Sequence, residues 1–273
     1  MSVDDMIEFQ RKIGPFIIKN IWFSDDLYDV EGVDAVQFIY SNYVGDKPGF
    51  SKEITTTLVI DLTKSLEEMW NSMDKKSTRL KILRALEDSS YVVRFNEKYE
   101  EFIDINRDFR KRKGLPPSMM SAEEMKAEYL LWTYEKDGVV LGGDLCIRDK
   151  NRIVLLNACS SMTSDSVFSR TTYSRANRLS IWEIIKYAKK EGMKEFDFGG
   201  FEQGKRAEEL KGLNEFKASF GGVMRERYTY SKSYSKLFYT GRFIYLTAVI
   251  TRYKLKSITN RMRANRTARL KTN

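Results

Sequence analysis

The absence of histidine limits the residue types with which this chain could do chemistry. Without histidine, a Ser-His or Cys-His nucleophilic pair is excluded, as is the commonest protein ligand of metals. Cys146 and Cys159, the only cysteines, lie inside apolar, strand-like runs. Such runs are typical of buried free thiols rather than of disulfides or zinc clusters. Any catalysis must therefore use carboxylates, lysine, tyrosine or backbone dipoles, and we expect no cofactor and no metal.

Residues of these types are concentrated in residues 194–222, which read KEFDFGGFEQGKRAEELKGLNEFKASFGG. A short strand is predicted to stop at Gly199 and Gly200, where the backbone can bend or approach a ligand closely. Helical spacing of apolar residues then predicts a helix over residues 208–220. Its apolar stripe consists of Leu210, Leu213, Phe216 and Phe220.

Two charged residues lie close to this break in the chain. Lys217 stands beside the apolar stripe and near the crevice at which the strand ends, although an exposed helix lysine is the alternative interpretation. Asp197, near the end of the strand, could accept a proton from an amine or orient that amine. It could also simply cap the glycine turn that follows. The residues themselves leave both pairs of alternatives open.

A second group of cations lies on a helix predicted over residues 75–86, with Leu80, Leu83 and Leu86 facing inward. Its cations that project elsewhere are Lys76, Arg79 and Arg84. They could form a solvated basic face of the helix, or a surface that binds phosphate groups.

Strands and helices alternate along the chain in the order that must position these residues. Strands are predicted over residues 17–23, 35–40, 55–62, 91–95, 127–135, 139–147, 152–158, 196–198 and 228–230. Further helices are predicted over residues 7–13, 97–113 and 172–191, together with one that begins after Thr63 or Ser65. From residue 91 the order is strand, helix, three antiparallel strands, helix, strand, helix, strand.

This order, together with two sequence blocks, resembles the GNAT superfamily of acyltransferases. It resembles more closely the Fem-type branch, the aminoacyltransferases that build peptidoglycan cross-bridges. The first block is VIDLTKSLEEMWNSMDKKSTRLKILRA at residues 59–85. The second comprises NRLSIWEIIKYAKKEGMKEFDFGGFE at residues 177–202 and GLNEFKASFGG at residues 212–222. The resemblance implies an α/β (α+β) protein with a mixed, largely antiparallel sheet flanked by helices.

The resemblance also implies a division into domains. We expect a reduced N-terminal GNAT-like domain over residues 1–90 and a GNAT-like acyltransferase domain over residues 91–230. A basic C-terminal helix and tail would occupy residues 231–273. Fem-type enzymes have two GNAT-like domains and often a helical arm, whereas the first domain is short here and no arm is evident.

The activity that the resemblance implies is N-acyl transfer, with an aminoacyl group moving from aminoacyl-tRNA to an amine of a cell-envelope precursor. In that family a Phe-Lys pair lies beside the reacting centre, and here the pair is Phe216 and Lys217. Lys217 would stabilise the tetrahedral oxyanion, a contribution of about 3 kcal/mol for one such donor. Tyr173 could supply a hydroxyl contact or pack in the core.

The acyl donor can be questioned from one further motif. GNAT enzymes that use acetyl-CoA cradle its pyrophosphate with a Q/R-x-x-G-x-G/A loop at a helix start. The equivalent residues 175–180 read RANRLS and lack both glycines, which suits aminoacyl-tRNA better. Arg175 and Arg178 could still hold phosphate there, or belong to a solvated helix start. An enzyme using acyl-CoA or an acyl carrier protein, and a non-catalytic RNA- or membrane-binding module, remain the alternatives.

The net charge of +9 is concentrated at the C-terminal end of the chain. Residues 231–273 hold eleven Lys and Arg and no Asp or Glu. Residues 237–250 are mainly apolar and too few to span a bilayer. They could form a docked final helix or an interfacial helix, with the polybasic residues 252–271 contacting an anionic membrane or tRNA. Since residues 1–10 lack the pattern of a signal peptide, we expect a cytoplasmic protein, peripheral to the inner face of the membrane if the tail binds there.

Overall fold

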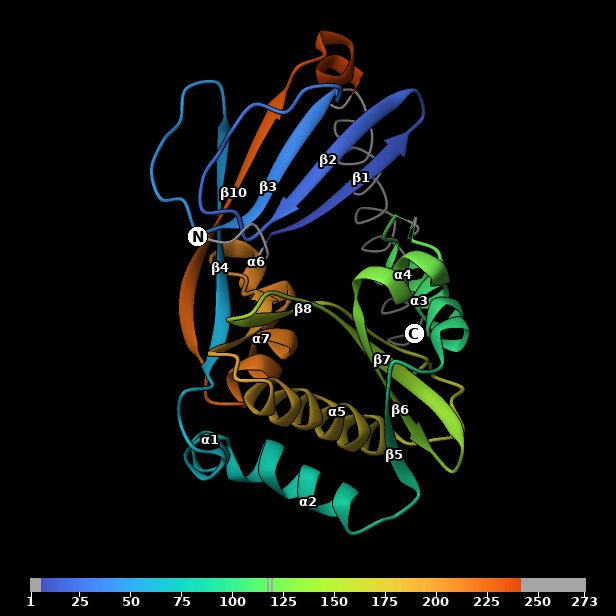
Figure 1. Cartoon of the computed structure of the whole chain (residues 1–273). Coiled ribbons are helices and arrows are strands. Elements are labelled where there is room, and N and C mark those ends of the chain that lie inside the picture. Colours follow the sequence, from blue (N-terminus) through green and yellow to red (C-terminus); the bar gives the residue numbers. More distant parts are fainter. Residues whose placement is uncertain (1–5, 117, 119, 242–273) are drawn as a thin grey trace, which may run out of the picture. The chain divides into compact units, whose positions relative to one another are not determined.

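A computed structural model describes residues 6–116, 118 and 120–241, which form two compact units (Figure 1). Among the described residues, unit 1 comprises residues 54–228, and unit 2 comprises residues 6–53 and 229–241. Two long strands, β4 (Ser51–Asp61) and β10 (Val223–Ser233), contribute residues to both units. The division into residues 1–90, 91–230 and 231–273 stays a prediction.

Unit 1 is built on a sheet whose strand β9 ends at the candidate residues Asp197, Gly199 and Gly200. Its strand order is β10, β4, β9 (Glu195–Gly200), β8 (Arg152–Ser160), β7 (Val139–Arg148), β6 (Leu130–Lys136) and β5 (Tyr91–Phe95). The pairs from β4 to β5 are antiparallel apart from β8 and β9, which are parallel. The mixed, largely antiparallel sheet flanked by helices is therefore confirmed.

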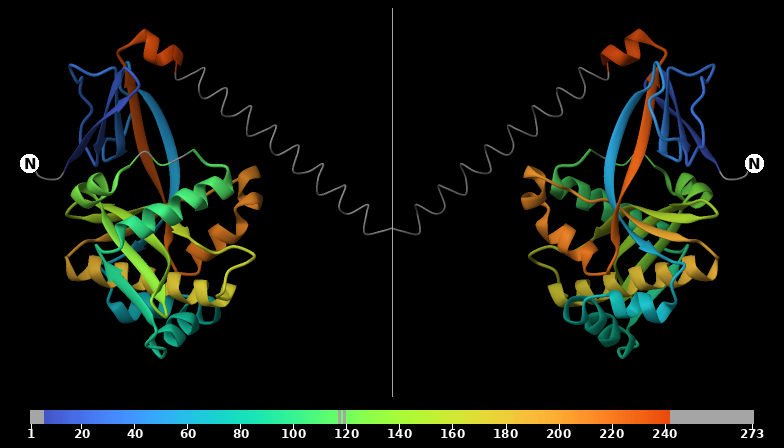
Figure 2. Two further views of the ribbon diagram at one scale, coloured as in Figure 1. Left: turned by 90° about the vertical axis from the view of Figure 1, so that its right-hand side faces the viewer. Right: turned by 90° about the vertical axis from the view of Figure 1, so that its left-hand side faces the viewer.

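Helices cover both faces of this sheet. They are α1 (Leu66–Ser72), α2 (Leu80–Leu86), α3 (Tyr99–Lys113), α4 (Ala122–Glu128), α5 (Arg170–Lys190), α6 (Lys205–Glu209) and α7 (Lys211–Ala218). Consecutive residues of a strand point to opposite faces. On β7, the Cβ position of Gly143 faces Phe102 of α3, whereas Asp144 bonds Ser180 of α5. Helices α3 and α5 therefore lie on opposite faces, and α2 lies alongside α5 (Figures 1 and 2).

The main core of unit 1 lies between α5 and the sheet. Ile181, Ile184 and Ile185 of α5 are fully buried, at the spacing of one helix face. Phe196 on β9 meets them from the sheet and packs edge-on against Phe198 at 4.7 Å. This packing fixes the end of β9, at which the candidate residues lie.

Unit 2 contains a strand where the sequence predicted a helix. Residues 7–13 form β1 (Ile7–Ile13), which pairs antiparallel with β2 (Phe16–Trp22) across a turn at Gly14. The expected helix is wrong because a hairpin with β2 pairs the backbone of the whole segment, which outweighs weak local helical spacing. β2 then pairs in parallel with β3 (Ala35–Ser41).

Three boundaries in unit 1 also differ from the predicted ones. Residues 127 and 128 end α4, which begins at a capping box of Ser121 and Glu124, so they do not belong to the following strand. The helix expected over residues 208–220 is interrupted at Leu210, whose backbone is not helical, and α7 follows it. Strand β10 begins at residue 223, before the predicted start at 228.

The inward face of α2 differs from the expected one. Ile82 and Ala85 are buried, whereas Leu80, Leu83 and Leu86 are exposed. Two apolar stripes run along this short helix, and spacing alone does not tell which stripe faces α5. In the structure the stripe of Ile82 and Ala85 is buried, and the three leucines are exposed to solvent.

The apolar and basic segments of the tail mostly lie outside the described residues, which end at Gly241. The predictions for residues 237–250 beyond that point, and for residues 252–271, therefore stay predictions. Among the residues that the structure describes, no helix combines the length and apolar character needed to cross a bilayer.

Candidate active site

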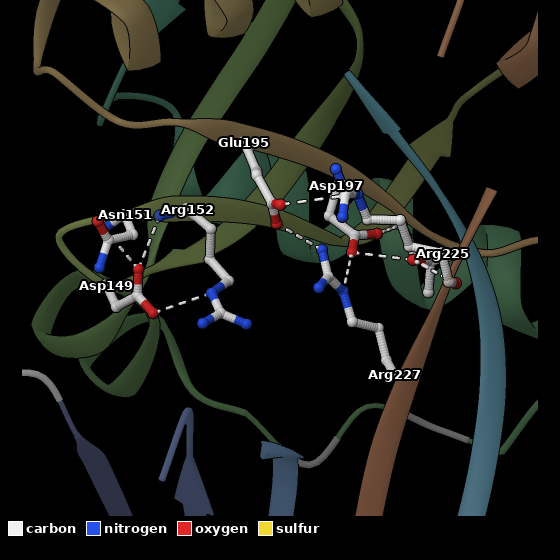
Figure 3. A network of polar contacts seen from close by, with 9 residues as sticks. Asp149, Asn151, Arg152, Glu195, Asp197, Arg225 and Arg227 are labelled. Atoms are coloured by element: carbon white, nitrogen blue, oxygen red, sulfur yellow. Dashed lines mark hydrogen bonds and ion pairs between the residues drawn. The ribbon is translucent and has the colours of Figure 1, made fainter. Parts of the chain in front are cut away.

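The end of β9 is held by a buried ionic network around Asp197 (Figure 3). The Asp197 carboxylate is fully buried and accepts the Gly199 N–H at 2.7 Å through Oδ1. Its Oδ2 accepts the Thr57 hydroxyl at 3.0 Å and Arg227 Nε at 2.8 Å. Gly199 has a φ of 71°, which favours glycine at this turn. The geometry gives Asp197 a turn-capping and ion-pairing role, while its part in proton transfer stays a prediction.

Arg227 is a functional contributor that the sequence reasoning missed. It bridges Asp197 and Glu195, whose Oε2 lies 2.7 Å from its Nη2 (Figure 3). Burial is the largest single effect on the pKa of Arg227 and lowers it, but the two carboxylates together outweigh burial and raise that pKa above its ordinary value. The period-two spacing of Glu195 with Asp197, and of Arg225 with Arg227, was the signal for two facing charged rows.

Lys217 is buried directly beside this network. Its side chain donates from Nζ to the carbonyl oxygen of Gly200 at 2.5 Å, and the residue is only 7% exposed. Burial lowers the pKa of its ammonium, against the opposing effect of the carboxylates of Asp197 and Glu202. No described carboxylate forms an ion pair with it. The interpretation as an exposed helix lysine is therefore wrong, and a cation without a carboxylate partner stands at the end of β9.

A cavity of about 390 Å³, here called the α5 cavity, opens next to Lys217's neighbour Phe216. It lies where β8 runs on to Ser160 beyond its short parallel pairing with β9 at residues 152–154. Its wall includes residues from β7, β8, α5 and α7, among them Asp144, Ser160, Tyr173, Asn177, Arg178 and Phe216. Three predicted site residues, Tyr173, Arg178 and Phe216, are thus brought together.

Arg170 and Arg178 line the α5 cavity, and Lys81 shares a hydrogen-bond partner with Arg178. The Arg178 guanidinium lies 4.9 Å from the centre of the Phe216 ring and donates to the Ser174 hydroxyl at 2.6 Å. Lys81 donates to the same hydroxyl at 3.0 Å. Burial lowers the pKa of Arg178 to about 10, and burial followed by repulsion from Arg178 and Arg175 lowers that of Lys81. This cluster favours an anionic group of a ligand.

The position of these arginines within α5 corrects one expectation. The helix begins at Arg170 with Ser169 as its N-cap, so Arg175 and Arg178 lie beyond its first turn rather than at its start. The loop that does precede the helix, residues 160–169, reads SSMTSDSVFS and also lacks glycine. The glycines of the acetyl-CoA motif are therefore also missing from the segment that precedes the observed start of α5.

The structure does not bring the three predicted cations of residues 75–86 into the α5 cavity. Lys76 and Arg84 are exposed, and Arg79 donates to Asn71 at 3.2 Å. Tyr173 is buried, and its hydroxyl lies 3.1 Å from that of Ser161. It lines the α5 cavity and is also packed in the core, so both interpretations of Tyr173 have a counterpart in the structure.

Asp144 is the second functional candidate that sequence reasoning missed. It is fully buried in the middle of β7, and its Oδ2 accepts the Ser180 hydroxyl at 2.6 Å. Its Oδ1 has no hydrogen-bond partner among the described residues. Burial, opposed by the Ser180 bond, raises its pKa to about 7. A single carboxylate within the apolar run VVLGGDLCI was the available signal.

No group of three or more potential metal ligands occurs among the described residues. The candidate site therefore consists of a buried lysine at the end of β9, and of a cavity whose wall holds arginines and one carboxyl group without an ion-pair partner among the described residues. Such an arrangement can bind an anion and stabilise charge that develops on a carbonyl oxygen.

Comparison with known proteins places this geometry in a family. Residues 75–218, more than half of the chain, match the family described as acetyltransferase (GNAT) domain. The chain therefore belongs to the GNAT acetyltransferase family. A comparison with curated protein sequences gives no significant match.

Several solved structures are similar in fold. FemX has a TM-score of 0.58 at 13% identity, covering 85% of this chain and 85% of its own. L-PGS from Bacillus licheniformis has a TM-score of 0.52 at 11% identity, and the match covers 91% of this chain and 85% of that chain. The C-terminal domain of a candidate lysylphosphatidylglycerol synthetase from Agrobacterium fabrum has a TM-score of 0.50 at 13% identity. The match covers 84% of this chain and 81% of that chain. These identities establish similarity of fold.

Proposed function

We propose that this GNAT protein is an aminoacyltransferase of the Fem type, which moves an aminoacyl group from aminoacyl-tRNA to an amine of a cell-envelope precursor. The observation that carries the proposal is the buried Lys217 ammonium, which donates to the Gly200 carbonyl at the end of β9. The fold shared with FemX and with lysylphosphatidylglycerol synthetases supports the choice of an aminoacyl group.

The reaction needs stabilisation of one transient charge. The acceptor amine attacks the ester carbonyl, and a C–N bond forms while the carbonyl oxygen becomes an oxyanion. Lys217 stabilises this oxyanion by a charge-assisted hydrogen bond, which a low-dielectric site strengthens. The C–O bond to the tRNA ribose then breaks, the ribose oxygen takes a proton, and the amine loses one. The product is an amide.

The start of α5 supports a donor other than acetyl-CoA. Its preceding loop, residues 160–169, has no glycine to let backbone N–H groups approach a pyrophosphate closely. The side-chain cations Lys81, Arg175 and Arg178 offer charge without that cradle. They suit the phosphates of a nucleic-acid end or of a nucleotide-linked precursor.

An enzyme that uses acyl-CoA is the second candidate, because the matched family is one of acetyltransferases. The two candidates separate when transfer is measured in parallel with charged tRNA and with acyl-CoA as donor. We expect product with charged tRNA alone. Product with acyl-CoA alone would replace the first proposal with the second, and no turnover with either donor would favour a binding module.

A further inference from the structure

The carboxyl group of Asp144 is poorly satisfied for a group so deeply buried. Ser180 of α5 is its one hydrogen-bond partner among the described side chains, and Oδ1 remains unpaired. Leaving a buried carboxyl oxygen unpaired costs folding free energy, so such groups usually have a function. Asp144 is fully buried and is one of the residues that form the wall of the α5 cavity.

Among the described residues, no cation forms an ion pair with this carboxyl group, although Arg170 lines the same cavity. The titratable side chains that interact with it are Tyr134 on β6, Cys146 on β7 and Cys159 on β8. Burial raises the pKa of each of the three, so they stay neutral near pH 7. Arg178 lines the same cavity but donates to Ser174 and forms no ion pair with Asp144. The Asp144 carboxyl group in the described cavity wall could therefore pair with one positive charge of a ligand.

The kind of cation that can bind at Asp144 depends on how many protein groups are available to coordinate it. A divalent metal ion prefers several oxygen ligands, whereas the described residues hold no group of three potential metal ligands. A primary ammonium needs one carboxylate and a few neutral acceptors. The Tyr173 hydroxyl on the same cavity wall can supply such an acceptor. The cavity volume of about 390 Å³ lies in the range of small-molecule sites.

We propose that Asp144 binds the ammonium group of the aminoacyl moiety in the α5 cavity and so selects acyl groups that carry an amine. This inference rests on the proposed aminoacyl transfer and names the residue that distinguishes an aminoacyl group from a plain acyl group. Arg178, which lines the cavity, would face the anionic part of the ligand. Ser180 is a positioning residue that holds the carboxyl group through Oδ2.

The charge pairing predicts a release of protons on binding. Without a ligand Asp144 has a pKa of about 7, so at pH 7 a part of the molecules carry a proton on it. A bound ammonium lowers that pKa, and a fraction of a proton is then released per ligand. A neutral ligand of the same shape releases none from this group.

The test uses alanine amide and propionamide, which share a skeleton and differ by the amine. Calorimetric titration of the full chain at pH 7 in two buffers of different ionisation enthalpy gives both affinity and proton release. We expect alanine amide to bind at least about tenfold more tightly, with proton release. Equal binding of the two amides, no measurable binding of either, or binding without proton release would overturn the inference.

Two variants and a control make the assignment specific. D144N should remove both the preference and the proton release, while D104N, a change at an exposed carboxylate of α3, should keep both. S180A removes the one bond that lowers the Asp144 pKa, so proton release should reach its midpoint at a higher pH. An unchanged preference in D144N, or an unchanged midpoint in S180A, would contradict the inference.

A third variant separates this inference from the proposed function. K217M should lose aminoacyl transfer and keep both the amide preference and the proton release, because Lys217 is assigned to the oxyanion. Transfer that depends on Lys217, combined with amide binding that is indifferent to D144N, would overturn the role of Asp144 alone.

Discussion

Burial shifts the pKa values of two site side chains, Lys217 and Asp144, in opposite directions. It lowers the pKa of the Lys217 ammonium and raises the pKa of the Asp144 carboxyl to about 7. In both cases burial disfavours the charged form of the group. Neither side chain has an ion-pair partner among the described residues. Both groups are therefore poised to interact with charge that a substrate brings.

The Asp144 pKa makes stability depend on pH in a defined direction. Because the folded pKa of about 7 exceeds the ordinary value of 3.8, the folded state binds more protons between these values. The free energy of unfolding must then fall as pH rises from about 4 through 7, by on the order of 4 kcal/mol in total. With no histidine in the chain, few other groups titrate between pH 5.5 and 8.

The prediction is that D144N flattens this dependence. Urea unfolding at pH 5.5 and pH 8 should show wild type losing a few kcal/mol, on the order of 2 to 3, while D144N loses much less. The side-chain amide oxygen of this variant can still accept the Ser180 hydroxyl bond, so the contact is kept. Parallel curves for the two proteins would show that Asp144 is ionised in the folded state throughout.

Arg227 is predicted to be structurally indispensable. R227M leaves the fully buried Asp197 without its cation and should lower the free energy of unfolding by about 3–5 kcal/mol. R107M is the matched control, because Arg107 pairs with Asp104 at 2.7 Å on the exposed surface of α3. Its cost should stay under about 1 kcal/mol. Similar losses in the two variants, measured by urea unfolding, would contradict a buried role for Arg227.

At this scale, sequence reasoning named residues better than it assigned their surroundings. Phe216, Arg178 and Tyr173 do line one cavity, but the burial of Lys217 could not be read from its helix position. Its environment depends on the Gly200 carbonyl, which comes from another element. Asp144 was missed because its burial and its lack of an ion-pair partner depend on the packing of α5 and the neighbouring strands around β7.

At the scale of elements, the packing of α2 on α5 shows the limit of periodicity. The structure buries Ile82 and exposes Leu83, although the leucines were the expected contacts. We predict that Ile82→Ala lowers the free energy of unfolding by about 2–5 kcal/mol. Leu83→Ala should cost less than about 1 kcal/mol in the same thermal or urea unfolding experiment. A larger loss for Leu83→Ala would restore the face predicted from the sequence.

Long, strongly patterned elements were predictable, and so were some short strands such as β5, but β1 was not. The helix α5 and the antiparallel strands β6 to β8 agree with their predicted ranges to within a few residues, since each buries a continuous apolar face. β1 was mistaken for a helix because its seven residues carry little periodic signal. Its conformation is decided by pairing with β2, which is tertiary information.

At the scale of the molecule, the family and sheet class were predictable from two sequence blocks and the order of elements. The contribution of β4 and β10 to both units was not, because the two strands are separated by more than 160 residues in the chain. Local patterns contain no record of such distant pairing.

The basic tail gives a prediction for the whole chain. A protein that ends at Ser257 lacks five of the eleven cations beyond residue 230. Since each basic residue contributes roughly 1 kcal/mol at an anionic surface, this variant should bind anionic liposomes and tRNA more weakly. The difference should shrink as salt rises, because screening weakens both interactions. Equal liposome and tRNA binding by the two proteins at low salt would make the tail a solubilising end.

The central claim is that Lys217 stabilises the oxyanion of aminoacyl transfer, and a single-turnover rate with charged tRNA tests it most directly. K217M should fold normally and lose roughly 100-fold or more in rate, as expected for one charge-assisted donor. K211M, a change at an exposed lysine of the same helix, should keep the wild-type rate. A near-wild-type rate in folded K217M would contradict the account.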